Sequence, residues 1–209
     1  MNDVLFEQLI AGKAPGLARL NVHQFHEMVA RGVLSEGEPI ELIEGLLVRK
    51  DRSDTGGDPM IHGPRHARAI TRWQRLERYF DETGFHVRCQ LPVTLGDRSE
   101  PEPDGAVVRG SDFDFRNRHP HANDVILICE ISDSSLDYDR GTKLVQYARA
   151  GIPTYWIINI PDQCIECHTS PGLSLGQYQQ RTVFQVGDTI SIALESNQTI
   201  SIQVADLLP

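Results

Sequence analysis

Apolar and polar residues are arranged in short periodic blocks over the first half of the chain. Apolar residues at helical spacing predict one helix over 21–30 and a longer one over 66–80. Between them, 39–49 alternates in a way typical of a β-hairpin that turns at a Glu-Gly pair, and 52–64, rich in Asp, Gly and Pro, predicts a loop. The pattern therefore mixes helices with strands from the start.

The second half predicts a buried strand–helix–strand unit. Residues 125–129 and 154–160 are continuous apolar runs, which indicate strands buried on both faces. The segment between them, 138–150, has helical spacing and ends at a Gly-x-Pro stop. A strand, a crossover helix and a second strand in this order favour parallel pairing.

The remaining segments complete a mixed architecture. Strands are predicted over 85–95 and 103–109, and the polar segment 111–123 predicts an exposed loop. Beyond position 161 the pattern indicates short β pieces separated by Gly, Asn and Pro. We expect one α/β (α+β) domain over 1–209, with an N-terminal helical part (1–38), a core (39–160) and a C-terminal β part (161–209).

Length, composition and charge narrow the class of protein. The 209 residues suffice for one sizeable core, and 40% apolar with 23% charged residues is ordinary globular composition. No apolar run is long enough to span a bilayer, and Asp3 and Glu7 interrupt the N-terminal segment, which therefore does not resemble a signal peptide. We expect a cytoplasmic protein that makes no contact with membranes. A net charge of −9 argues against broad adhesion to nucleic acid but leaves a phosphodiester substrate open.

Two carboxylates lie at the ends of predicted strands. Glu130 comes directly after the apolar run 125–129, and Asp104 lies beside another short strand. An ionised carboxylate in such a place needs a cation or a hydrogen-bond network, and oxygen donors suit Mg²⁺ or Mn²⁺. Asp139, Lys143 and Tyr147 are spaced by four residues and so share one helix face. This combination of residues suits metal-assisted hydrolysis of a phosphodiester, with Lys143 stabilising the developing anion.

Simpler interpretations compete with this hypothesis. Asp139 and Lys143 could form only a surface ion pair, worth a few tenths of a kcal/mol, or Asp139 could cap its helix. Cys164, Cys167 and His168 spell the attachment pattern of c-type haem, but the exported chain and haem-enclosing helices that it needs are missing from the sequence pattern. A zinc site would need two more ligands. We therefore expect these residues to lie on a β-hairpin, and we expect reduced thiols.

The same residues resemble a known family. In order along the chain, the segments that carry the resemblance are Glu41-Leu-Ile-Glu44-Gly45, Pro103-Asp104, Glu130-Ile131-Ser132, Asp139-x-x-x-Lys143-x-x-x-Tyr147 and Gly151-Ile-Pro-Thr-Tyr155-Trp156. Together they look like the signature of the Uma-two family of restriction-endonuclease-like proteins, in the PD-(D/E)XK nuclease superfamily. The resemblance extends from near Val22 to Leu208. It implies a restriction-endonuclease-like fold, that is, a mixed, curved β-sheet with flanking helices.

The resemblance also implies roles for individual residues. Asp104 and Glu130 would bind the metal, helped by the main-chain carbonyl of Ile131. The superfamily pattern places a lysine two residues after the strand glutamate, where this chain has Ser132. In the family the lysine lies on the following helix, which here is Lys143.

The remaining expectations concern residues around this centre. Glu41 would be a further catalytic carboxylate, with Glu44 the weaker candidate, and we expect His66 and Ser132 to contact substrate. Tyr155 and Trp156 fit the core better than the chemistry.

The implied activity is Mg²⁺-dependent (or Mn²⁺-dependent) endonucleolytic hydrolysis of DNA by a homodimer. Two alternatives stay open at this point: a catalytically weak nucleic-acid-binding or regulatory module on the same fold, and a nuclease acting on RNA. Two basic segments could touch a DNA backbone or simply be solvated: the face of Arg68, Arg72 and Arg75, and the loop from Arg116 to His121.

Overall fold

A computed structural model describes residue 11 and residues 18–50, 63–194 and 198–209. Most of the predicted loop 52–64 lies outside these residues, and so does the N-terminal segment that was compared with a signal peptide. Among the described helices, none has both the length and the apolar character needed to cross a membrane.

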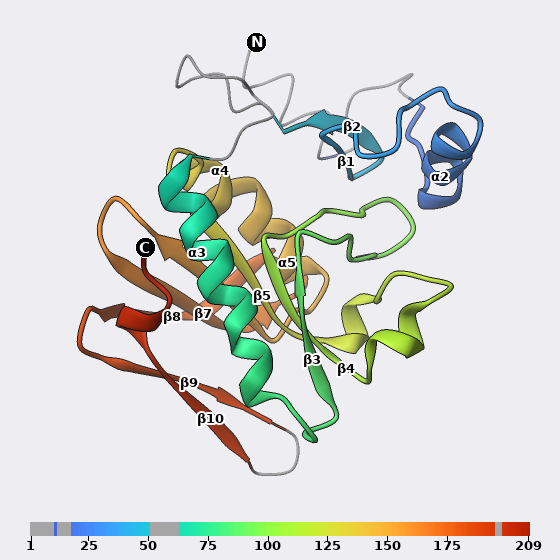
Figure 1. Ribbon diagram of the computed structural model, residues 1–209. Coiled ribbons are helices and arrows are strands. Elements are labelled where there is room, and N and C mark those ends of the chain that lie inside the picture. Colours follow the sequence, from blue (N-terminus) through green and yellow to red (C-terminus); the bar gives the residue numbers. More distant parts are fainter. Residues whose placement is uncertain (1–10, 12–17, 51–62, 195–197) are drawn as a thin grey trace.

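The centre of the molecule is a six-stranded mixed sheet in the order β3-β4-β5-β6-β7-β8 (Figure 1). Neighbouring strands run antiparallel except β5 and β6, which are parallel, as the strand–helix–strand pattern predicted. The strands of this sheet are β3 Phe85–Cys89, β4 Gly105–Arg109, β5 Val125–Ser132, β6 Thr154–Asn159, β7 Cys164–Gly172 and β8 Gln177–Gln185.

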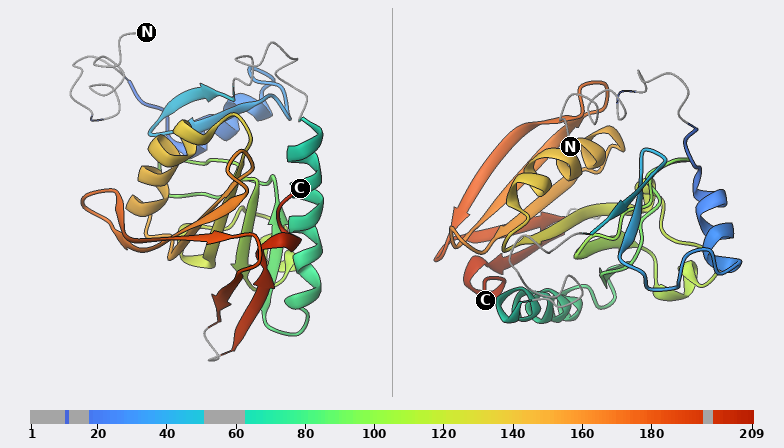
Figure 2. Two further views of the ribbon diagram at one scale, coloured as in Figure 1. Left: turned by 90° about the vertical axis from the view of Figure 1, so that its left-hand side faces the viewer. Right: turned by 90° about the horizontal axis from the view of Figure 1, so that it is seen from above.

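Helices cover both faces of the sheet. Figure 2 shows α3 (Pro64–Gln74) on one face and, on the opposite face, the helical stretch 136–149. A 3₁₀ turn, Arg75–Tyr79, prolongs α3. The stretch 136–149 comprises α4 Leu136–Tyr138, a π-helical turn Asp139–Lys143 and α5 Leu144–Arg149.

Two apolar cores follow from the alternation of side chains along the sheet. All eight residues of β5 are buried, as its continuous apolar run predicted. On one face Leu127 and Cys129 join a cluster with Trp73 of α3, whereas on the other Ile128 packs with Tyr147 and its neighbours. Because β5 is covered on both faces, any charged side chain that it carries must find a partner inside the protein.

Helix α3 packs closely on the sheet where its Trp73 side chain meets the backbone of Gly105. A Cβ atom at this position would lie 2.2 Å from Cε2 of Trp73, so only glycine fits. The Trp73 indole donates a hydrogen bond to the Arg88 carbonyl at 3.1 Å and meets Trp156 edge-on at 6.3 Å between ring centroids. The C-terminal part of α3, which carries Trp73, is thereby held against the start of β4.

Two hairpins lie outside the central sheet. β1 (Ile40–Ile43) and β2 (Leu46–Arg49) form the first, as predicted, and it turns through Glu44 at φ 51° and Gly45 at φ 77°. β9 (Thr189–Ala193) and β10 (Thr199–Gln203) form the second. The β9–β10 hairpin adds its isoleucines to the core beneath α3 (Figure 1).

Helix α2 (Val22–Ala30) packs at the periphery beyond the β1–β2 hairpin (Figure 1). Asn21 caps it as predicted, in a reciprocal capping box with Gln24. No residue of α2 is buried, and its contacts with the rest of the protein include the hydrogen bond from the Val22 amide to the Asp97 carbonyl at 2.8 Å. The helix therefore depends on a few specific contacts for its position.

Three details differ from the sequence pattern. The strand expected over 85–95 ends at Cys89 because Gln90 adopts φ 49°, which breaks the extended backbone. Glu130 was expected at the end of its strand, but β5 continues to Ser132, which pairs with Asn159 of β6. The expected loop over 111–123 contains the 3₁₀ turns Asp112–Phe115 and Ala122–Asp124.

The C-terminal strands also depart from expectation. β7 and β8 are nine residues each and belong to the central sheet, rather than being short separate pieces. A last 3₁₀ turn, Val204–Asp206, follows β10. Cys164 and Cys167 lie on the β7–β8 hairpin, as predicted, and all four cysteines are free thiols.

Candidate active site

A buried lysine joins two glutamates that come from different elements. Lys143 lies in the π-helical turn, Glu41 on β1 and Glu130 on β5. The Lys143 ammonium donates a hydrogen bond to Oε1 of Glu41 at 2.7 Å and lies 3.3 Å from Oε1 of Glu130. The side chains of Lys143 and Glu41 are only 4% and 1% exposed. The three side chains are therefore fixed against one another and shielded from water.

The charge states of these groups follow from their surroundings. Burial alone would raise the pKa of Glu41, but the ammonium groups of Lys143 and Lys50 outweigh it and hold that pKa below its usual value. Burial alone would lower the pKa of Lys143, yet Glu130 and Glu41 raise it above its usual value. Burial raises the pKa of Glu130 to about 8, and nearby carboxylates add to this although Lys143 opposes it. Glu41 and Lys143 are thus held in their charged forms, whereas the protonated form of Glu130 is favoured at neutral pH.

Asp104 lies next to this group at the start of β4. Its Oδ2 accepts the Ile131 amide at 2.9 Å and lies 3.0 Å from Nε2 of His66, in the first turn of α3. The Asp104 amide in turn donates to Oε2 of Glu130 at 3.3 Å. Burial would raise the pKa of Asp104, but His66 and the Ile131 amide hold it below its usual value. Asp104 is therefore an ionised carboxylate placed beside Glu130.

A layer of hydrogen bonds behind the site fixes its orientation. The Tyr147 hydroxyl donates to Oε1 of Glu130 at 2.6 Å. Asp139 accepts from Ser132 at 2.6 Å and from Ser135 at 2.5 Å, so it neither forms the surface ion pair with Lys143 nor contacts solvent freely. Burial raises the pKa of Asp139 above its usual value, although the hydrogen bonds from these two hydroxyls oppose the shift. Tyr155 donates to the main-chain carbonyl of Asp139 at 3.0 Å and is fully buried, in keeping with a role in the core.

Two charged residues that the sequence pattern did not single out belong to the site. Lys50, just after β2, lies 3.3 Å from Oε1 of Glu41 and 3.0 Å from Oε2 of Glu102. The Glu102 amide donates to Oε1 of Glu41 at 2.7 Å. The predicted hairpin was the signal from which Lys50 could have been found. Its antiparallel strands bring position 50 back beside the strand that carries Glu41.

The predicted residues thus fall into two groups. Five lie together, and these are Glu41, His66, Asp104, Glu130 and Lys143. Ser132 lies behind them, fully buried, and its hydroxyl is directed to Asp139. Glu44 is at the hairpin turn, 3.9 Å from the Arg19 guanidinium, and is not part of the group.

Among the described residues, no hydrogen bond or ion pair joins the side chains of either basic segment to the five site residues. In the first, Arg72 donates a hydrogen bond to the Ala205 carbonyl near the C-terminus. In the second, Arg118 pairs with Asp124 at 2.7 Å. Their contact with DNA stays a prediction.

The donor set around Asp104 and Glu130 fits a divalent cation of the Mg²⁺ type. Its side-chain donors are carboxylate oxygens, which are the ligands that Mg²⁺ prefers. Burial raises the pKa of Glu130 and nearby carboxylates add to this shift; a bound cation would favour the ionised carboxylate. In a β-strand, the amide N–H and the carbonyl of one residue point to the same neighbouring strand. The Ile131 amide meets Asp104, so the Ile131 carbonyl lies on that same side of β5.

Comparisons with known proteins bear on the family and the fold of the chain. The sequence model of the Uma2 family, described as "Putative restriction endonuclease", matches residues 22–205. Among solved structures, a crystal structure of "a putative nuclease belonging to DUF820" from Anabaena variabilis superposes with a TM-score of 0.60. It is 20% identical, and the alignment covers 85% of this chain and 94% of that one. At this identity the likeness shows a shared fold, a mixed sheet flanked by helices. No curated protein matches the chain.

Proposed function

This chain belongs to the Uma2 family, and on that premise we propose that it is an endonuclease that hydrolyses DNA phosphodiester bonds with Mg²⁺ as its cofactor. The observation that carries the proposal is the buried Lys143 between Glu41 and Glu130, with the ionised Asp104 beside them. A structural ion pair needs one carboxylate for each cation. Here three carboxyl groups, Glu41, Glu130 and Asp104, lie in one group with Lys143. The raised pKa of Glu130 and the lowered pKa of Asp104 are typical of functional sites.

Asp104 and Glu130, with the main-chain carbonyl of Ile131, would hold the cation. When bound, Mg²⁺ supplies a water of lowered pKa and neutralises charge on the scissile phosphate. His66 lies 3.0 Å from Oδ2 of Asp104 and so orients that carboxylate through its imidazole. The Tyr147 hydroxyl does the same for Glu130.

Lys143 acts through its charge. Because its pKa is raised, it keeps its proton throughout the physiological range and cannot serve as a general base. One of its N–H groups donates to Glu41, and Oε1 of Glu130 lies 3.3 Å from the same nitrogen. The ammonium stabilises the negative charge that develops on the phosphate in the transition state. Glu41, itself held by Lys50 and the Glu102 amide, fixes the position of that ammonium.

The partner in this proposal is DNA. A second copy of the chain would bring a second site for the opposite strand, which is the reason to expect a homodimer. Ser132 would contribute to substrate binding only by way of Asp139, to which its hydroxyl is directed.

A cleavage panel tests the proposal. Supercoiled plasmid, single-stranded DNA and RNA are incubated with the protein in Mg²⁺, Mn²⁺ or EDTA, and nicked plasmid reports endonucleolytic cutting. We expect Asp104→Asn and Lys143→Met to lose at least about 10²–10³-fold in rate. The controls Asp137→Asn and Arg149→Met make the same kinds of charge change at exposed positions of the helical stretch 136–149 and should cut like the parent.

Each outcome decides between the functions considered. Cutting of plasmid that needs the metal, Asp104 and Lys143 supports the DNA endonuclease. Cutting of RNA alone would move the assignment to a ribonuclease. A parent protein that binds Mn²⁺ and nucleic acid but cuts nothing would be a binding module, and variants as active as the parent would overturn the proposed site.

A further inference from the structure

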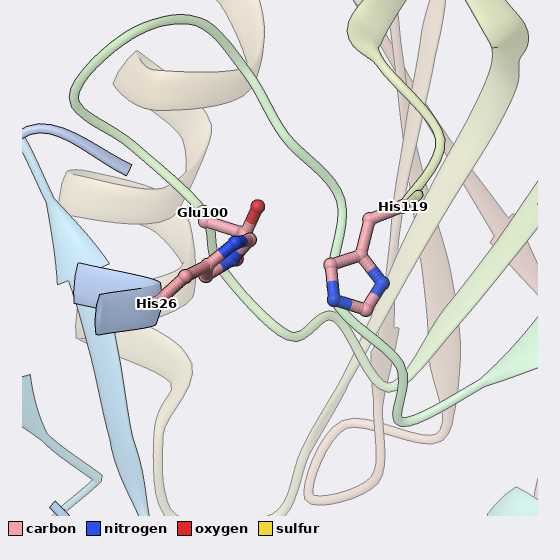
Figure 3. A group of neighbouring side chains, drawn as sticks. All are labelled: His26, Glu100 and His119. Carbon is pink, nitrogen blue, oxygen red and sulfur yellow. The ribbon is translucent and has the colours of Figure 1, made fainter. Parts of the chain in front are cut away.

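Two histidines and a glutamate meet away from the candidate active site. His26 comes from α2, Glu100 from the segment 99–102 and His119 from the loop 116–121 (Figure 3). One ligand atom from each lies within 4.8 Å of the others. These three segments are far apart in the sequence, so the fold alone brings the side chains together.

The distances among the donors suit a single transition-metal ion. With bonds of about 2.0–2.1 Å and tetrahedral geometry, two donors on one Zn²⁺ are about 3.3 Å apart. Nε2 of His26 and Oε1 of Glu100 are now 2.5 Å apart, and the upper limit for all pairs is 4.8 Å. Changes of about 0.8–1.5 Å in these separations would therefore place all three around one ion.

The glutamate has the surroundings of a ligand rather than of an ordinary surface carboxylate. Its side chain is 2% exposed, and within the described residues its ion-pair partner is His26. The Thr94 hydroxyl donates to Oε2 of Glu100 at 2.6 Å, which leaves Oε1 directed at His26. An outer hydrogen bond of this kind orients metal-binding carboxylates. The His26 side chain is 49% exposed, so an ion can enter and keep a water molecule on the solvent side.

We propose that His26, Glu100 and His119 form a binding site for Zn²⁺ or a similar transition-metal ion, separate from the Mg²⁺ site. Two imidazoles and one carboxylate favour Zn²⁺, Co²⁺ or Ni²⁺, whereas Mg²⁺ prefers oxygen donors alone. The bound ion fastens α2 and the loop 116–121 to the segment 99–102. This segment continues to Glu102, whose amide holds Glu41, so the ion stabilises one wall of the candidate active site.

Isothermal titration of the purified, untagged protein with Zn²⁺ in excess Mg²⁺ tests the site. We expect one Zn²⁺ per chain in the parent. Loss of an outer partner typically weakens a metal site about 10–100-fold, so Thr94→Val should fall in that range. His26→Ala and His119→Ala should weaken binding further. His23→Ala removes an exposed histidine from the same helix and is the matched control that should bind like the parent.

The outcomes separate this site from the rest of the molecule. Anomalous scattering at the zinc edge from crystals soaked in Zn²⁺ should show a peak between His26, Glu100 and His119. Asp104→Asn should keep full Zn²⁺ affinity, and binding is measured whether or not the protein cuts DNA. Equal Zn²⁺ affinity in the parent, His26→Ala and His119→Ala, or a peak only at the cysteines, would overturn the proposal and leave a hydrogen-bonded His–Glu pair.

Discussion

Replacing Lys143 by methionine tests the electrostatic reasoning behind the site. The side chain keeps its length and apolar stem but loses the ammonium, which lies 2.7 Å from Glu41 and 3.3 Å from Glu130. Breaking a buried ion pair by removing one partner typically costs 3–5 kcal/mol, because the other charge stays buried without compensation. Glu130, with its pKa raised to about 8, can take up a proton at neutral pH and so limits the loss.

Glu41 carries most of the remaining penalty. Burial would raise its pKa, and Lys143 and Lys50 hold it below its usual value in the parent; without Lys143, this buried carboxylate keeps only part of that compensation. Lys50 at 3.3 Å and the Glu102 amide compensate in part. We therefore expect Lys143→Met to cost about 3 kcal/mol. For a chain of this size that corresponds to a fall of roughly 6–12 °C in Tm.

Urea denaturation at pH 7 in EDTA measures this cost. The double variant Glu41→Gln/Lys143→Met removes the stranded charge and should be more stable than Lys143→Met alone, which a double-mutant cycle quantifies. Arg149→Met, at an exposed site, should stay within about 0.5 kcal/mol of the parent. A Lys143→Met variant that loses less than about 1 kcal/mol, or a double variant no more stable than the single one, would refute the reasoning.

Three further predictions concern the same region. Gly105→Ala would place a Cβ 2.2 Å from the Trp73 ring, so we expect a loss of about 3 kcal/mol in urea denaturation, whereas Gly141→Ala, with open space around it, should not destabilise the protein. Tyr147→Phe removes the 2.6 Å hydrogen bond to Glu130 and should cost about 1.5–3 kcal/mol by the same assay; a change below about 0.5 kcal/mol would contradict it. Without metal, in EDTA, folding raises the pKa of Glu130 from 4.5 to about 8. Between these two pH values the folded state binds a proton that the unfolded state does not. The contribution of Glu130 to the free energy of unfolding is therefore full below pH 4.5 and is lost as the pH rises to 8. Thermal unfolding between pH 4.5 and 8 should show a decline that Glu130→Gln flattens, and an equal decline in both proteins would count against the assignment.

The sequence supported most of the fold because its strongest patterns are also the most buried elements. The apolar runs of β5 and β6 needed no tertiary information, and neither did the helical spacing around Lys143. Asp104 and Glu130 were found because a carboxylate beside a buried strand is costly. These inferences rest on local periodicity and on the free energy of burying charge.

Other features depended on contacts that local patterns do not encode. Gln90 adopts a positive φ that residue type alone does not favour, so the end of β3 was misplaced. The helical spacing over 138–150 predicted a helix there but did not distinguish the π-helical turn Asp139–Lys143 from a regular α-helix. Lys50 meets Glu41 only because the hairpin closes, and His26 meets His119 only in the folded chain.

The β1–β2 hairpin has a consequence for how the site is assembled over time. It adds no strand to the central sheet and is held to the segment 97–102 by main-chain bonds such as Glu100 to Leu42 at 2.7 Å. Such a unit can open locally at a free energy well below that of global unfolding. Each opening separates Glu41 from Lys143 while β5, with Glu130, keeps its place. The equilibrium of this local opening then sets the fraction of molecules that have a complete site. Amide hydrogen exchange at Leu42 would measure the opening equilibrium independently of the melting temperature.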